Sequence, residues 1–342
     1  SFWEGVAVSE GHSPSGGGLE KAGADRSRAQ VTTRTWILAG MKGPVRNNGD
    51  LLPGWLRQSI PLPGLTPRAS PLCSSVAACQ TPAMTEALRI HVQPVLRQST
   101  LVLAFRGWND AGEAASTALS FLDQAIQSVP LADVDPDGFY DFTVMRPEVF
   151  LGAEGRRQIR WPSLEFRYGS ADSSREVVTG IGTEPHIRWR GYCDCIAALC
   201  AEFGLDQVVL LGAYLADVVY SRPVQVTGFA TDSEALSRLG VTPSGYEGPT
   251  GIVGVLAERL EREGASVASL WAGLPHYIQA APNSRGALAL IQKLTAHLDI
   301  KVDDEPLRQS AAEFEQRVAQ LVNDDTELAA YVRQLKRRGF AQ

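Results

Sequence analysis

Short apolar runs alternate with amphipathic segments over the second half of the chain, which is typical of an α/β protein. Uninterrupted apolar runs predict buried strands at 101–105, 207–213, 224–230 and 267–274. Segments with apolar residues on one helical face follow or precede them, and they predict helices at 110–126, 189–203, 251–263 and 283–297. This order predicts a mainly parallel or mixed sheet covered by helices on both faces.

The region 139–182 has a different pattern, with shorter strand-like runs. These runs are Phe142–Met145, Gln158–Trp161 and Val177–Ile181. We therefore predict hairpin or edge strands in this region.

Polar residues at the beginning of two of these helices predict how the helices are capped. Asp110 with Glu113 three residues later has the pattern of a capping box, and Asn283 with Ser284 is a further N-cap signal. Gly264 is a typical helix end.

The last forty residues form a separate pattern of helices. Spacings of four and three residues relate the apolar positions Leu307, Ala311, Phe314, Val318 and Leu321. The segment 323–327 has the composition that ends one helix and caps another, and Leu328, Val332 and Leu335 continue the spacing. We predict a C-terminal helical hairpin over 303–342, used for packing or subunit contact.

Residues 1–83 show no helical or strand periodicity and are rich in Gly, Ser and Pro, which predicts disorder. They carry eight basic and five acidic residues, a net charge of +3, so that the remainder of a chain of net charge −6 carries −9. Met84 lies where the composition changes. The sequence is consistent with a non-native extension before Met84 or with a regulatory tail, and we expect the α/β domain to span 84–302.

Composition narrows the classes of function. A pI near 5.5 argues against a broad nucleic-acid-binding face. The longest apolar stretch, Val208–Ala216, is far shorter than the roughly 20 residues of a membrane helix. Five cysteines without a repeating framework favour a reducing compartment, so we expect a cytoplasmic protein that binds neither membranes nor nucleic acid.

Loops at predicted strand ends carry the candidate site residues, because open α/β sheets bind ligands there. They are Trp108, Asn109, Asp110, Glu184, Asp217, Arg222, Tyr246, Glu247, Thr250, His276 and Tyr277. Several also have a structural interpretation: Asp110 and Thr250 as helix caps, Glu184, Asp217, Arg222 and His276 as salt bridges or loop anchors, and Trp108 and Tyr277 as core. No nucleophile elbow is present, and Cys193, Cys195 and Cys200 lack the further ligands of a metal site. We assign no catalytic residue, metal or cofactor.

Five segments of this sequence resemble the proteasome assembly chaperone family (second-subunit type), actinobacterial branch. They are Phe105–Gly112, Gly182–Pro185, Leu215–Asp217 running to Ser221–Val224, Tyr246–Gly251 and Pro275–Tyr277. The resemblance implies a three-layer α/β sandwich like that of nucleoside phosphorylases, with a C-terminal helical extension. It also implies a homo-oligomer, with a trimer favoured.

From the resemblance we expect a non-enzymatic assembly chaperone or scaffold whose partners include proteasome α-type subunits. The alternative is a nucleoside- or sugar-phosphate-processing enzyme of phosphorylase or hydrolase type. In that case Glu184 and His276 would be the acid–base pair, and the Gly248–Gly251 turn would lie near an anion.

Overall fold

The computed structural model describes residues 85–152, 155–172 and 175–338. The chain divides into two units, Ser1–Ser75 and Val76–Gln342, and every described residue belongs to the second. Its strands are β1 (Leu88–Ile90), β2 (Thr100–Arg106), β3 (Val129–Val134), β4 (Glu148–Leu151), β5 (Arg157–Arg160), β6 (Leu164–Asp172), β7 (Arg175–Thr183), β8 (Gln207–Ala216), β9 (Val226–Ala230), β10 (Thr242–Pro243) and β11 (Ser266–Pro275). Its helices are η1 (Thr85–Ala87), η2 (Ala111–Glu113), α1 (Ala114–Ala125), α2 (Trp189–Phe203), α3 (Ser233–Arg238), α4 (Ile252–Arg262), α5 (Ser284–Leu298), α6 (Glu305–Asp324) and α7 (Thr326–Arg338).

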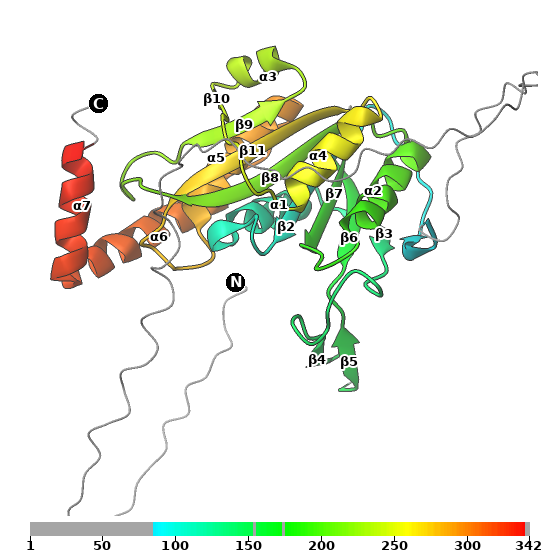
Figure 1. Ribbon diagram of the computed structural model, residues 1–342, viewed down its shortest axis with the longest axis horizontal. Helices are drawn as coiled ribbons and strands as arrows, with labels where there is room; N and C mark the ends of the chain where they lie inside the picture. Colours follow the sequence, from blue (N-terminus) through cyan, green and yellow to red (C-terminus); the bar gives the residue numbers. More distant parts are fainter. Residues whose placement is uncertain (1–84, 153–154, 173–174, 339–342) are drawn as a thin grey trace, which may run out of the picture. The chain divides into compact units, whose positions relative to one another are not determined.

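A nine-stranded mixed sheet forms the centre of this unit (Figure 1). The strand order is β1-β3-β6-β7-β2-β8-β11-β9-β10. The four middle strands β7, β2, β8 and β11 run parallel, and antiparallel strands flank them on both sides. The carboxyl ends of the four parallel strands therefore meet at one edge of the sheet, called here the carboxyl edge.

Helices cover both faces of the sheet and make three layers. On one face α2 and α4 bury residues such as Tyr192 and Leu256 against strand residues such as Leu103 and Leu210. On the other face α1 and α5 bury Leu119 and Leu290 against the alternate strand positions. The long apolar runs of the middle strands reflect this two-sided burial. The predicted three-layer α/β class is confirmed.

The start of α1 differs from the predicted capping box. The Asp110 carboxylate accepts hydrogen bonds from the backbone N–H of Ala115 (2.7 Å) and Ser116 (3.3 Å), so it does cap the helix. The short helix η2 intervenes, and Glu113 has a left-handed φ of 53° instead of completing a box. The helix α1 therefore begins at Ala114, and the predicted start at Asp110 is wrong. A tight turn joins β2 to α1.

One prediction for the region 139–182 is corrected, because Phe142–Met145 forms turns instead of a strand. Val177–Ile181 lies in β7, which pairs with β6 as an antiparallel hairpin, one of the two predicted arrangements. β7 also pairs with β2, so it is an interior strand of the sheet. Gln158–Trp161 does mark the hairpin of β4 and β5, whose second strand is Arg157–Arg160, and this hairpin forms a sheet of its own.

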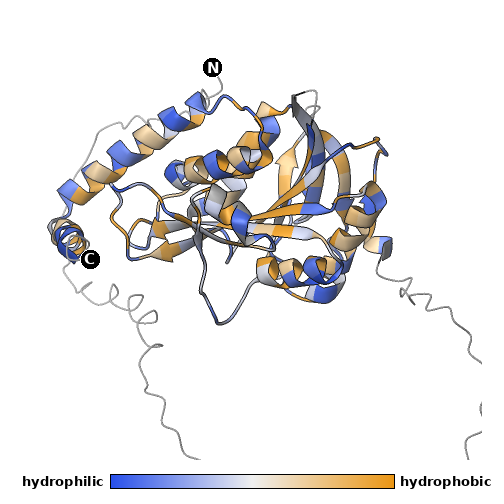
Figure 2. Ribbon diagram, turned by 90° about the horizontal axis from the view of Figure 1, so that it is seen from above, coloured by the Kyte–Doolittle hydropathy of each residue, from blue (hydrophilic) through white to orange (hydrophobic). Residues whose placement is uncertain are grey.

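The C-terminal extension consists of α6 and α7, and Asp325 caps α7 by accepting from the N–H groups of Glu327 and Leu328. Four of the five predicted seam residues of α6 are buried, whereas Leu321 is 55% exposed and Val322 is buried in its place. Hydrophobic and hydrophilic residues alternate along α6 (Figure 2). In Figure 1, α7 turns away from α6 instead of folding back along it.

Residues 1–84 lie outside the described residues, so the predicted disorder and the boundary before Met84 stay predictions. Within the described ranges, no helix has the length and apolar character that a bilayer span requires.

Helix α2 buries three cysteines among apolar side chains. Burial raises the pKa of the thiols of Cys193 and Cys200 to about 12 and that of Cys195 to about 11. The neutral thiol therefore dominates at physiological pH, and these residues pack as small apolar side chains.

We expect native Cys193, Cys195 and Cys200 to react with iodoacetamide at pH 8 at least about 100-fold more slowly than in the unfolded chain, because the thiolate is the reactive form. Mass spectrometry of their peptides, with and without guanidinium chloride, measures the two rates. Equal rates would show that α2 does not bury these thiols.

Candidate functional site

The sequence-predicted site residues gather in two groups along the carboxyl edge. The first group lies where β2, β7 and the start of α4 meet, and it contains Trp108, Asn109, Asp110, Glu184, Tyr246, Glu247 and Thr250. The second lies where β8 and β11 end, and it contains Asp217, Arg222, His276 and Tyr277.

A carboxylate–amide clamp, made of Glu184 and Asn109, holds the first group together. Glu184 Oε1 accepts hydrogen bonds from Asn109 Nδ2 and from the backbone N–H of Ile252, both at 2.8 Å. The N-cap residue Gly251 has no side chain to cap α4, so the Glu184 carboxylate, which directly follows β7, performs this role. A negative charge at a helix N-terminus is stabilising. Glu184 is therefore a structural cap in this arrangement.

Thr250 does not cap α4, contrary to the interpretation of the sequence. Its hydroxyl lies 3.4 Å from the neighbouring carbonyl of Gly251. Tyr246 stiffens the same segment, since its hydroxyl donates to the carbonyl of Pro249 at 2.9 Å. Tyr246 is nevertheless 66% exposed, and Trp108 in the β2–η2 loop is 63% exposed. Trp108 is therefore not part of the core.

The Asn109 side chain is completely buried, and its Oδ1 atom has no hydrogen-bond partner among the described residues. The atom faces Gly251: a Cβ atom at that position would lie 2.3 Å from Asn109 Oδ1 and 2.7 Å from Glu184 Oε1. Only glycine therefore lets the start of α4 lie against the clamp without displacing it. This close approach explains why the Tyr246–Gly251 segment ends in a glycine.

In the second group, His276, Tyr277 and Tyr331 form a cluster of three rings. Their centroids are 5.5 to 5.7 Å apart, and each pair meets nearly edge to face. The cluster attaches α7 to the loops after β8 and β11. Sequence reasoning missed Tyr331, whose position near His276 depends on where α7 packs.

Hydrogen bonds fix the same loops. Tyr277 Oη accepts from the N–H of Tyr220 (2.9 Å) and donates to the carbonyl of Val218 (3.1 Å). His276 Nδ1 lies 3.1 Å from Asp217 Oδ1. The polar residues of the second group therefore anchor the β8–β9 loop, which agrees with the structural interpretation of these residues.

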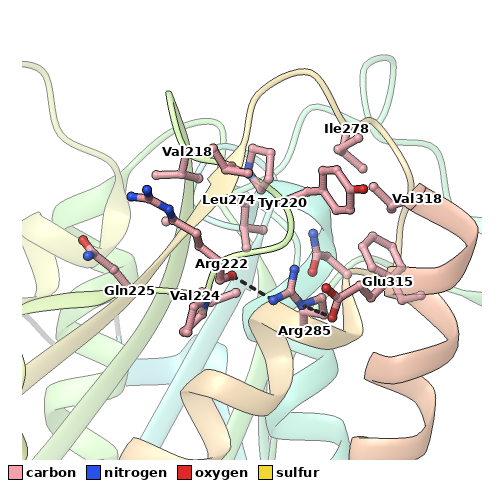
Figure 3. Close-up of a pocket in the computed structure, with 16 residues that line it drawn as sticks. Val218, Tyr220, Arg222, Val224, Gln225, Leu274, Ile278, Arg285, Glu315 and Val318 are labelled. Carbon is pink, nitrogen blue, oxygen red and sulfur yellow. Dashed lines mark hydrogen bonds and ion pairs between the residues drawn. The ribbon is translucent and has the colours of Figure 1, made fainter. Parts of the chain in front are cut away.

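A cavity lies beside this group, between the β8–β9 loop, the start of α5 and α6 (Figure 3). Arg285 crosses it, donating to the carbonyl of Arg222 (2.8 Å) and pairing with Glu315 (3.5 Å). The volume of this cavity is about 30 Å³, which is enough for one or two waters. Small-molecule sites are larger, at about 300–1,000 Å³.

A larger cleft of about 620 Å³ lies between the β4–β5 hairpin and the β1–β3–β6 end of the sheet. Arg89, Asp133 and Glu165 line its sheet side, and Phe150, Ile159 and Trp161 line its hairpin side. Arg89 is paired with Asp133 and Asp135. None of the sequence-predicted site residues lines this cleft.

Comparison with known proteins places the chain in a family. The model of the PAC2 family matches residues 104–322. The chain belongs to the PAC2 family. This confirms the resemblance stated above, and the five segments that carry it lie at the carboxyl edge of the PAC2 fold.

Two solved PAC2-type structures are similar over almost their whole length. A PAC2 family protein from Streptomyces avermitilis is 38% identical with a TM-score of 0.63, and the match covers 68% of this chain and 99% of that one. A proteasome-assembly chaperone homologue from Mycobacterium tuberculosis is 36% identical with the same TM-score and the same coverage. An archaeal proteasome activator from Pyrococcus furiosus shares the fold at 18% identity, with a TM-score of 0.55 over 68% of this chain and 97% of that one. No curated protein sequence matches the chain.

The clamp predicts that Gly251→Ala destabilises the PAC2 fold by about 1–3 kcal/mol, because the added methyl group meets Asn109 and Glu184. Urea unfolding monitored by circular dichroism measures this change in free energy. Gly245→Ala is the matched control, since a Cβ there meets nothing within 4 Å, and it should change the stability by less than about 0.5 kcal/mol. Equal effects of the two substitutions would contradict the clamp.

The ring cluster predicts a difference between two tyrosines. Tyr277→Phe removes the partner of the Tyr220 N–H and should cost about 1–2 kcal/mol in the free energy of unfolding. Tyr331→Phe removes only a 3.4 Å contact with an exposed histidine and should cost less than about 0.5 kcal/mol. The same urea titration compares them, and a larger loss for Tyr331→Phe would be evidence against this assignment.

Proposed function

We propose that this PAC2 protein is a non-enzymatic assembly chaperone or scaffold that binds α-type subunits of the proteasome core particle. The observation that carries the proposal is the 36% identity to a proteasome-assembly chaperone homologue over 99% of that protein's length. Fold similarity alone would not support a shared role, but this level of identity over a whole chain is stronger support.

The geometry of the carboxyl edge favours this role over the enzymatic alternative. Glu184 follows β7 and His276 follows β11, and β2 and β8 lie between these strands. Three strand spacings of about 4.8 Å separate the two residues by about 14 Å across the sheet. Paired acid and base carboxyls at a glycosidic bond lie about 5–9.5 Å apart. This separation of the strands, together with the contacts that hold both side chains within the fold, argues against Glu184 and His276 acting on one bond.

The remaining candidate groups support the same conclusion. Glu184 holds the start of α4, Asp217 contacts His276, and the cavity beside Arg222 is about 30 Å³. The exposed residues of the carboxyl edge include large apolar side chains, such as Trp108, Leu215 and Tyr246. Exposed apolar surface is the kind of surface that binds proteins. We further propose that the protein acts in the cytoplasm as a homo-oligomer, with a trimer favoured.

Native mass spectrometry of the full chain tests the proposal, alone and mixed with α-type proteasome subunits from the same organism. We expect a mixed complex of fixed stoichiometry, because a chaperone binds its client before assembly. The β-type subunits serve as the control and should not bind. A chain that ignores the α-type subunits would overturn the proteasome assignment.

A further inference from the structure

The β4–β5 hairpin forms an arm that projects from the carboxyl edge of the sheet (Figure 1). Its base is attached to the body through the rings of Phe142 and Trp161, whose centroids are 4.8 Å apart. A two-stranded sheet by itself is at best marginally stable in water. An arm of this kind gains stability when another surface covers one of its faces.

One face of the arm is apolar and open to solvent. Val149 pairs with Ile159 and Leu151 pairs with Arg157, so these four side chains share a face. Val149 is 62% exposed, Leu151 is 69% exposed and Ile159 is 55% exposed. Three adjacent aliphatic side chains, each more than half exposed, form a contact surface with a single basic residue at its side.

The charge of the arm is opposite to that of the rest of the chain. Residues 146–160 contain four arginines and two glutamates, a net charge of +2. Without Arg146 the hairpin itself carries +1, and because the whole chain carries −6, the residues outside 146–160 carry −8. The arm therefore fits an apolar surface that bears carboxylates, and a second copy of this chain offers such a surface.

Among the described residues of the carboxyl edge, Tyr246 and Glu247 place an exposed ring beside an exposed carboxylate, which is the chemistry that matches the arm. Tyr246 is 66% exposed, and its ring is held by the hydrogen bond to Pro249. Glu247 beside it is exposed. Carboxylates next to other exposed apolar residues of the carboxyl edge already have partners: Asp217, near Leu215, pairs with His276.

We propose that the β4–β5 arm docks on the Tyr246–Glu247 segment of a second copy, with Arg157 beside Glu247 and the aliphatic face against Tyr246. The proposal rests on the homo-oligomer proposed above and not on the proteasome assignment. A stable interface buries about 800 Å² on each partner, more than three aliphatic side chains supply. Because every copy carries both an arm and an acceptor segment, a closed assembly uses both on each chain.

Charge reversal tests the contact on the full chain, with sedimentation velocity and native mass spectrometry as the measurements. Arg157→Glu alone and Glu247→Arg alone should each weaken self-association by at least about tenfold, because each places like charges together. The chain with both substitutions should regain self-association to within about threefold of the wild type. A purely structural role of either residue would not produce this recovery.

A second pair of variants tests the apolar face. The double variant Val149→Thr with Ile159→Thr keeps β-branched residues in the arm and should also weaken self-association. The control is Val129→Thr, which is 47% exposed on β3 at the opposite edge of the sheet and should have no effect. An unchanged thermal midpoint verifies that each variant is folded.

A wild-type chain that stays monomeric at every concentration would overturn the proposal, and so would arm variants that associate normally. Failure of the combined charge reversal to recover would overturn the pairing with Glu247. Loss of binding to α-type subunits with self-association intact would show that the arm serves a client and would equally overturn the second-copy assignment.

Discussion

The hydrogen bonds to the Glu184 carboxylate determine the arrangement of the carboxyl edge. One oxygen accepts from the side chain of Asn109 and from the first N–H of α4, so it joins the loop after β2, the end of β7 and the start of α4. The contact is charge-assisted and partly shielded from water, conditions in which a hydrogen bond contributes more than the usual 0.5–1.5 kcal/mol or so. The position of α4, and hence the path of the Tyr246–Gly251 segment, follows from it.

Polar side chains of the carboxyl edge make their contacts inside the fold. A carboxylate that satisfies a helix N-terminus, a histidine that contacts Asp217 and Tyr331, and an arginine that crosses a small cavity are all engaged within the fold. The exposed groups include large apolar side chains, namely Trp108, Leu215, Tyr246 and the aliphatic face of the arm. These two observations are the structural support for the protein-binding role proposed above.

The arm and the ring cluster show how attachments extend the central sheet. The arm is tied to the body at its base by Phe142 and Trp161, and α7 is tied to the body by His276, Tyr277 and Tyr331. Both attachments include aromatic contacts, and at α7 the buried residues Val332 and Leu335 add an aliphatic cluster with Val219 and Ile278. The two attachments lie near different ends of the carboxyl edge, and the exposed apolar residues are found along it.

The sequence by itself determined the three-layer class, the strands at 101–105, 207–213 and 267–274, and α2 at Trp189–Phe203. Local periodicity encodes these elements because each buries its apolar residues in a repeating pattern. The sequence also placed the candidate residues at strand ends. Only the tertiary structure decided that Glu184 caps α4, that Val177–Ile181 lies inside the sheet, and that Tyr331 meets His276. Those outcomes depend on contacts between residues far apart in the chain, such as Glu184 and Ile252, which are 68 positions apart, and no local pattern records such contacts.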